Sequence, residues 1–173
     1  GDVGVAFAAR EPNDVGLAVL DGVPLDPLLE RMEAGEIDLA IVMENDLFRR
    51  APRRRVERAL RRTPTIVIDH LATPTARHAR LVLPSTNVFE AAGSFVNAEG
   101  RRQHFVPMVQ PAPPLRAAWR WLAALGKSAG RDAATWNDFA ALLADLGRVR
   151  PALEEGITTA DPGFDALVNG SAR

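Results

Sequence analysis

Three short apolar runs divide the first half of the chain, and amphipathic segments separate them. Residues 37–43 form a nearly unbroken apolar run, which is typical of a strand buried on both faces of a parallel sheet. Residues 65–68 and 81–83 are shorter runs of the same kind, and Pro84 ends the last of them. Strands that alternate with helical segments predict an α/β fold with a Rossmann-like parallel sheet.

Capping residues place helices between these strands. Asp26 can cap a helix that has Pro27 at its first position, and Gly35 stands where a left-handed C-cap belongs. Pro52 opens a second helix that extends to residue 62, and Thr73 caps a short third helix. The order strand, helix, strand, helix, strand is that of a doubly wound sheet.

The two ends of the chain differ from this middle part. Residues 15–20 fit either irregular structure or a short strand. After a proline-rich stretch at residues 111–114, one helix is predicted at residues 115–125. Another is predicted at residues 136–146, capped by Thr135 with Asp138 completing the capping box. We therefore predict an α/β domain over residues 1–110 and a helical C-terminal extension over residues 111–173.

A dense polar loop follows the third predicted strand. Asn97 and Gly100 are favoured at the first and last positions of a tight turn, which would join residues 95–96 to the apolar run at residues 104–106. Turn geometry alone explains these two residues. Glu90 and Glu99 could instead form a general acid/base pair, but no nucleophile with an adjacent base completes such a site. Glu99 could equally pair with Arg101 or Arg102 across the turn.

Polar side chains follow each of the three predicted strands directly. Ligands of open α/β sheets bind beyond the carboxyl ends of the strands, where the sequence places Glu44, Asn45, Asp46, Asp69, His70, Ser85, Thr86 and Asn87. No glycine-rich dinucleotide fingerprint or phosphate-binding loop accompanies them. Because carboxylates suit phosphates poorly unless arginines or helix N-termini offset their charge, we favour a structural or vestigial edge over an occupied one.

Composition argues against several classes of function. The 173-residue chain has a formal net charge of −1, whereas general binding to nucleic acids or membrane surfaces needs a basic excess. The chain contains no cysteine, so neither an ordinary iron–sulfur cluster nor a disulfide can form within it. No apolar stretch in the sequence is long enough to predict a transmembrane helix.

The arginines and the histidines could each be assigned a binding function, which we do not favour. The arginines between residues 49 and 62 could contact RNA or anionic lipid, but no aromatic residue is interleaved with them to stack a base. A solvated helix face, or a contact with an acidic neighbouring subunit, explains them better. His70, His78 and His104 match no zinc-binding spacing, so we expect no metal site.

Several motifs together resemble the molybdopterin oxidoreductase superfamily. A strand that ends in Leu-Pro is followed by the residues of its loop pattern, Glu90, Gly93, Asn97, Glu99, Gly100, Arg101 and Gln103. Three other segments are similar to the large iron–sulfur subunit of bacterial NADH-quinone oxidoreductases, respiratory complex I: Glu-Asn-Asp-Leu-Phe-Arg at residues 44–49, Asp69-His70 with Thr73, and Trp-Arg-Trp-Leu at residues 119–122. The resemblance covers roughly residues 25–146.

The resemblance implies that this chain is part of a longer protein, and the absence of an initiating methionine fits that expectation. In such a subunit the 4Fe-4S and 2Fe-2S clusters belong to an N-terminal part that precedes this segment. The whole enzyme passes electrons from NADH through these clusters to quinone, coupled to ion translocation. This segment would be a scaffold for docking that contacts other peripheral-arm subunits of complex I at the cytoplasmic face of the bacterial inner membrane.

For the segment itself the resemblance implies no catalytic residue, no cofactor or metal, no nucleic-acid partner and no direct membrane insertion. It implies a vestigial cofactor edge whose candidate residues are Asp69, Thr73, Glu90, Gly93, Asn97, Glu99, Gly100 and Arg101. One alternative is an active molybdopterin enzyme such as a formate dehydrogenase, in which these residues hold one end of the cofactor. Another is an unrelated doubly wound domain with a helical tail, if the match of motifs is chance.

Overall fold

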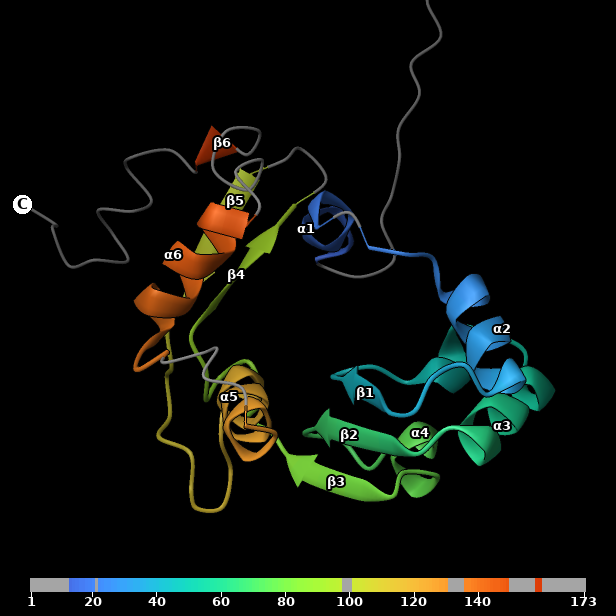
Figure 1. Ribbon diagram of the computed structural model, residues 1–173. Coiled ribbons are helices and arrows are strands. Elements are labelled where there is room, and N and C mark those ends of the chain that lie inside the picture. The colour runs from blue at the N-terminus through green and yellow to red at the C-terminus, as the bar shows by residue number, and fades with distance from the viewer. Residues whose placement is uncertain (1–12, 21, 98–100, 131–135, 150–157, 160–173) are drawn as a thin grey trace, which may run out of the picture. The chain divides into compact units, whose positions relative to one another are not determined.

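The computed structural model describes residues 13–20, 22–97, 101–130, 136–149 and 158–159. The chain divides into two compact units that alternate along the sequence. The sheet unit comprises residues 23–91 and 107–136, and the hairpin unit comprises the described residues within 1–22, 92–106 and 137–173. Figure 1 labels the α-helices and strands of both units.

A three-stranded parallel sheet lies at the centre of the sheet unit. Its strands are β1 (Ala40–Met43), β2 (Thr65–Asp69) and β3 (Leu81–Pro84), in the order β1-β2-β3. Val42 lies opposite Val67 and Ile68 lies opposite Leu83 in the register of the three strands. The Rossmann-like parallel α/β sheet that the sequence predicts is therefore confirmed.

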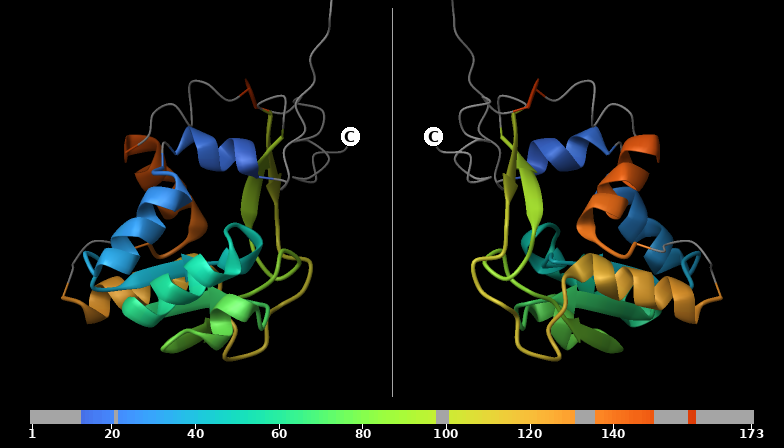
Figure 2. Two further views of the ribbon diagram at one scale, coloured as in Figure 1. Left: turned by 90° about the vertical axis from the view of Figure 1, so that its right-hand side faces the viewer. Right: turned by 90° about the vertical axis from the view of Figure 1, so that its left-hand side faces the viewer.

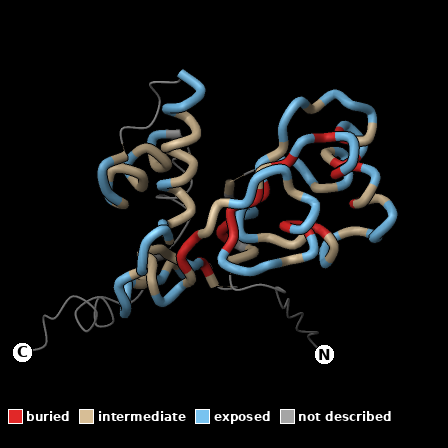
Figure 3. The backbone as a smooth tube through the Cα atoms, turned by 90° about the horizontal axis from the view of Figure 1, so that it is seen from below, coloured by how far each residue is buried: buried red, intermediate tan, exposed pale blue. Residues whose placement is uncertain are grey.

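Helices cover both sides of this sheet. Helix α2 (Leu25–Ala34) packs against α3 (Arg53–Arg62), and η1 (Leu47–Arg49) and α4 (Pro74–Arg77) contribute to the same core. Helix α5 (Ala118–Ser128) lies on the side of the sheet opposite α3 (Figure 2). Buried stretches gather in the interior of the sheet unit (Figure 3), where the core consists of Leu29, Met32, Val42, Leu47, Val56, Ala59, Leu60, Val67 and Ala76.

The first strand differs from its prediction in length and in burial. β1 begins at Ala40 rather than at residue 37. Val42 is 9% exposed, but its neighbours Ile41 and Met43, which point to the other face, are 44% and 46% exposed. The prediction of burial on both faces is thus wrong for β1, because β1 is an edge strand and α5 packs mainly against β2.

The ends of the predicted helices in the sheet unit are only partly confirmed. Gly35 has φ of +77° and ends α2, as the sequence predicts, and the Thr73 hydroxyl caps α4. Helix α2 begins at Leu25 rather than after Asp26, because the Asp26 carboxylate accepts a hydrogen bond from Arg55 instead of capping its own helix. Helix α5 begins at Ala118 rather than at residue 115, because the Arg116 carbonyl accepts from the Thr86 N–H beside β3.

The hairpin unit contains an antiparallel pair of strands, β4 (Gly93–Val96) and β5 (Arg101–Phe105). This pair confirms the hairpin expected around the turn that begins at Asn97. The rings of Phe95 and Phe105 lie 4.9 Å apart across the two strands, and β6 (Thr158–Thr159) pairs with β5 in parallel.

Two helices of the hairpin unit correct the sequence predictions. Residues 15–20 were expected to be irregular or a strand, but α1 (Asp14–Val19) is a helix that packs against β4. The Asn13 side chain links the two elements by accepting a 3.0 Å hydrogen bond from the Val96 N–H. Helix α6 (Phe139–Val149) begins later than predicted, because Asp138 accepts from the Ala141 N–H and so acts as the cap, whereas Thr135 lies outside the described residues.

Candidate functional site

The carboxyl ends of the three parallel strands bring together polar residues from separate parts of the sequence. Glu44 follows β1, Asp69 ends β2 and Ser85 follows β3. The Glu44 N–H donates to the Ile68 carbonyl at 2.8 Å, and the Ser85 N–H donates to the Asp69 carbonyl at 3.1 Å. These bonds align the three strand ends as the sequence predicts. We call this set, with His70 and Thr86, the carboxyl edge.

Asp69 lies at the centre of the carboxyl edge and is only 6% exposed. Its carboxylate accepts a 2.9 Å hydrogen bond from the Leu71 N–H, and Nδ1 of His70 lies 3.5 Å from the same oxygen. The imidazole adds a charge interaction when it is protonated. One function of Asp69 is therefore local, because its carboxylate holds the turn that follows β2.

Glu44 has an unusual backbone and an unusual carboxyl group. Its φ of +49° lies in the left-handed region, which is unfavourable for residues other than glycine. Although the residue as a whole is exposed, partial burial of its carboxyl raises the pKa of Glu44 above the ordinary value, and the neighbouring Asp69 carboxylate adds to this rise. The Ser85 hydroxyl and His70 oppose the rise in pKa by stabilising the charged form.

Ser85 and Thr86 complete the carboxyl edge with two buried hydroxyls. The residues are 1% and 3% exposed, and neither hydroxyl has a hydrogen-bond partner of good geometry within the described part of the chain. The Ser85 hydroxyl therefore lowers the pKa of Glu44 from nearby, without a hydrogen bond of good geometry. A buried hydroxyl without a partner costs free energy, so these two groups are the strongest sign of a missing polar partner at this edge.

Asp46 follows the same strand as Glu44, but its carboxylate has partners within the fold. One oxygen accepts a 2.7 Å hydrogen bond from the Thr75 hydroxyl and a 3.3 Å bond from the Phe48 N–H. Thr75 is fully buried, and its hydroxyl also accepts from the Leu47 N–H at 2.8 Å. Asp46 therefore fastens η1 to α4.

The remaining candidates from the sequence have local structural contacts. Thr73 caps α4, and the Glu90 carboxylate accepts a 3.1 Å hydrogen bond from the Asn87 N–H. Gly93, Asn97 and Arg101 belong to the hairpin unit, whereas Asp69, Thr73 and Glu90 belong to the sheet unit. The Asn97 side chain accepts a 2.9 Å hydrogen bond from the Arg101 N–H across the turn. Glu99 and Gly100 lie outside the described residues.

Gly93 is required by a close approach of an aromatic ring. A Cβ atom at this position would lie 2.3 Å from Cζ of Phe105 on the paired strand. Glycine therefore lets the Phe105 ring cross β4, which gives this residue of the loop pattern a packing role.

Comparison with known proteins places the sheet and the loop in a family. The model of the molybdopterin oxidoreductase family matches residues 6–128, which include all three strands of the parallel sheet and the hairpin. The chain belongs to the molybdopterin oxidoreductase family. This result confirms the resemblance found from the loop pattern between Glu90 and Gln103.

The curated relatives that the chain matches include several G subunits of NADH-quinone oxidoreductases. The protein of Shewanella oneidensis is 42% identical over 146 residues, which are 80% of this chain and 16% of that protein. The protein of Yersinia pestis is 35% identical over 178 aligned residues, covering 96% of this chain and 19% of its own length. The protein of Salmonella typhimurium is 36% identical over 142 residues, covering 79% of this chain and 16% of its own. The chain thus spans less than a fifth of the length of these relatives.

The donors and acceptors of the carboxyl edge do not fit the phosphates of a pterin dinucleotide. Glu44 and Asp69 present carboxyl groups there, and the nearby Arg116 guanidinium is stacked on the Trp121 ring at 4.8 Å. Phosphates are held by guanidinium groups, lysines or free N–H groups of helix N-termini. The carboxyl edge as defined above contains two carboxylates and neither an arginine nor a lysine, so its residues do not match the phosphates of a pterin dinucleotide.

The same residues do not form a metal centre. Within the ranges that the structure describes, no group of three or more His, Asp or Glu side chains could hold a metal ion. The His78 ring instead contacts Phe48, with centroids 5.2 Å apart and planes tilted by 39°, and its Nδ1 lies 3.0 Å from the Pro74 carbonyl. None of the described helices has the length and apolar character needed to cross a membrane.

Sequence reasoning missed one feature of the surface. Arg61, Arg62 and Arg80 line a hollow together with His78. The density of arginine on α3 was visible in the sequence, but Arg80 is not on that helix. Only the parallel pairing of β2 with β3 brings the residue before β3 beside the end of α3.

Proposed function

We propose that this chain is a structural and docking part of the large iron–sulfur subunit of an NADH:quinone oxidoreductase. The observation that carries the proposal is the similarity to NADH-quinone oxidoreductase subunits over most of the chain, at 35–42% identity. The whole enzyme would transfer electrons from NADH through iron–sulfur clusters to quinone, coupled to ion translocation. The clusters would belong to another part of the subunit, because this chain contains no cysteine.

The contacts made by the motif residues support a structural role. Asp46, in the segment that resembles the iron–sulfur subunit, holds η1 to α4, and Thr73 caps α4. Trp121, in the later Trp-Arg-Trp-Leu segment, donates its indole N–H to the Pro84 carbonyl at 2.8 Å. Each of these residues makes a specific contact within the fold, so their presence requires no redox chemistry in this segment.

The proposed partners are the other subunits of the peripheral arm of complex I. The assembled enzyme would place the chain at the cytoplasmic face of the bacterial inner membrane without direct insertion. Candidate residues of the ancestral cofactor edge, including Asp69 and Glu90, would then serve local structure. The same proposal divides the chain into an α/β domain over residues 1–110 and a helical C-terminal extension over residues 111–173.

One observation favours a second candidate, an active molybdopterin oxidoreductase such as a formate dehydrogenase. The buried hydroxyls of Ser85 and Thr86 have no hydrogen-bond partner of good geometry among the described residues, and they lie at the edge where a ligand of an open α/β sheet binds. A ligand could supply the missing partner. The carboxyl groups of Glu44 and Asp69 at that edge argue against phosphates there, so we favour the first proposal.

Elemental and pterin analysis of the full-length native protein separates the two candidates. Iron, molybdenum and tungsten are measured on one sample, and pterin is measured by fluorescence after oxidation. The first proposal expects iron without molybdenum, tungsten or pterin, in a preparation with NADH–quinone oxidoreductase activity. Stoichiometric pterin with molybdenum or tungsten would transfer the assignment to the second candidate.

A further inference from the structure

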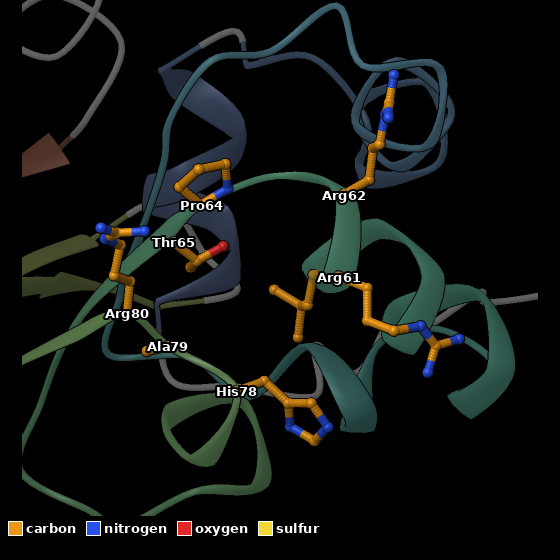
Figure 4. A pocket seen from close by; sticks show the side chains of 8 residues that line it. Arg61, Arg62, Pro64, Thr65, His78, Ala79 and Arg80 are labelled. Atoms are coloured by element: carbon orange, nitrogen blue, oxygen red, sulfur yellow. The ribbon is translucent and has the colours of Figure 1, made fainter.

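A basic hollow lies at the amino-terminal edge of the parallel sheet, where β2 and β3 begin. Its volume is about 260 Å³, and its lining includes Arg61 and Arg62 of α3 together with His78 and Arg80. Thr65, the first residue of β2, also lines it (Figure 4). The carboxyl edge lies at the other ends of the same strands, so the hollow is a separate feature of the sheet unit.

Other arginines of α3 have acidic partners supplied by the fold. Arg55 bonds to Asp26 at 2.7 Å and to Glu30 at 3.1 Å, and Arg58 bonds to Glu33 at 3.1 Å. All three acidic residues are on α2. The side of α3 that faces α2 is therefore close to neutral.

The arginines of the hollow lack such partners. Arg61, Arg62 and Arg80 are exposed, and across the described residues none of them forms an ion pair with an acidic side chain. Arg62 differs from the other two because its side chain lies close to Gly35, the residue that ends α2. A Cβ atom added at Gly35 would lie 2.8 Å from Nε of Arg62. Arg62 thus lies against the C-terminus of α2, where a cation is favourable. Arg61, in the last turn of α3, and Arg80, before β3, are the arginines of the hollow for which the described residues supply neither an acidic partner nor a contact with α2.

The directions of the side chains distinguish between possible occupants. Figure 4 shows that the guanidinium groups of Arg61, Arg62 and Arg80 point in different directions and do not converge on one point. A single phosphate is held by donors that converge on its oxygens. Diverging guanidinium groups instead suit several carboxylates spaced along a polypeptide, each of which pairs with one arginine.

We propose that this basic hollow is a docking surface for an acidic segment of another protein chain in the same assembly. The inference rests on the proposed function, which requires contacts with neighbouring subunits, and it names the surface and the chemistry of one such contact. Charge complementarity favours this occupant. Carboxylates of the partner would form ion pairs with Arg61 and Arg80, as carboxylates of α2 do with Arg55 and Arg58.

Zero-length crosslinking in the native assembly tests this proposal. Lys127 is the only lysine of the chain, so the variants Arg61→Lys and Arg80→Lys each add one reactive amine at the hollow while retaining the positive charge. Carbodiimide treatment joins a lysine amine to a contacting carboxylate through an amide bond, and the linked peptides are identified by mass spectrometry. Arg54→Lys is the matched control, because Arg54 is exposed on the same helix but does not line the hollow.

The expected result is a crosslink from residue 61 or residue 80 to an Asp or Glu of another chain of the assembly, with much less from residue 54. The charge-reversed double variant Arg61→Glu/Arg80→Glu should also lower retention of the full-length protein in the assembly, more at low salt than at high salt, compared with Arg54→Glu. Crosslinks confined to this chain, or none from residues 61 and 80 in an intact assembly, would overturn the inference. Recovery of a bound lipid or phosphate at the hollow instead of a protein carboxylate would overturn it too.

The two proposals can fail separately. If the wild-type protein purifies without NADH–quinone oxidoreductase activity, the proposed function fails. A crosslink from the hollow to whichever chain accompanies the protein would still establish the docking surface. If the activity is present but residues 61 and 80 yield no crosslink to another chain, only the docking inference fails.

Discussion

The Thr75 hydroxyl donates a 2.7 Å hydrogen bond to the Asp46 carboxylate across 29 residues of sequence. The same hydroxyl accepts from the Leu47 N–H at 2.8 Å, so one buried oxygen of α4 bonds both to Asp46 and to the first residue of η1. Hydrogen bonds of this kind fix the loop after β1 in place, and with it the approach to the carboxyl edge.

Thr75→Val should lower the free energy of unfolding by about 2 kcal/mol, because it leaves the buried Leu47 N–H without a partner and removes the shortest hydrogen bond to the Asp46 carboxylate. Thr75→Ser keeps the hydroxyl and should recover most of this loss. Urea denaturation of the three proteins measures the difference. Equal midpoints for the valine variant and the wild type would show that the hydroxyl contributes nothing net.

Trp121→Phe should cost about 1 kcal/mol of stability, because it removes the indole N–H that donates to the Pro84 carbonyl while it retains an aromatic ring. Trp119→Phe is the control, because the contact described for Trp119 is with the guanidinium of the exposed Arg120. Thermal unfolding should show a larger fall in Tm for the change at residue 121. The reverse order would contradict the anchoring role of Trp121.

Two glycine substitutions should have opposite signs. Gly35→Ala should destabilise the protein by about 1–2 kcal/mol, because φ is +77° and the new Cβ would approach the Arg62 side chain. Gly126→Ala should stabilise it by about 0.5–1 kcal/mol, because Gly126 lies within α5 and a Cβ there would meet nothing within 4 Å. Chemical denaturation of both variants checks the signs.

Arg55→Ala should destabilise the protein by about 0.5–1 kcal/mol, at the modest scale of ion pairs whose acidic partners are largely in water. The Arg55 side chain is 22% exposed, whereas those of Asp26 and Glu30 are 71% exposed. The loss should shrink in high salt, which screens the charges. Arg54→Ala, which removes an exposed arginine without an ion pair among the described residues, should change the unfolding midpoint little.

Glu44→Gln should change how stability depends on pH. The pKa of Glu44 is raised in the folded protein, so between the ordinary value of 4.5 and the folded value the unfolded chain releases a proton that the folded chain retains. Stability of the wild type therefore falls as pH rises through this interval, and the neutral glutamine lacks this loss. Tm of the variant relative to wild type should be higher at pH 7 than at pH 4. A Tm difference that is independent of pH would show that the Glu44 carboxyl titrates alike in both states.

Local signals in the sequence predicted much of the fold and the position of the carboxyl edge. Apolar runs identified all three strands of the parallel sheet, and Gly35 and Thr73 correctly marked the end of α2 and the start of α4. The edge was predictable because parallel strands necessarily place their carboxyl ends together. The hydrogen-bond partners of the side chains that follow the strands were not predictable. The partner of Asp46, for example, is a threonine 29 residues away in the sequence.

The sequence by itself determined the order of the strands and helices of the parallel sheet, the family and the absence of cysteine ligands for a cluster within this chain, because these follow from periodicity, motifs and composition. The tertiary structure alone decided that Asp26 bonds to Arg55 instead of capping its helix, and that residues 15–20 form a helix beside β4. It also decided that Arg61 and Arg80 share one hollow without an acidic partner among the described residues. Charge pairing and burial depend on which segments lie next to each other in space. The pairing of the strands sets this arrangement, and local sequence does not encode that pairing.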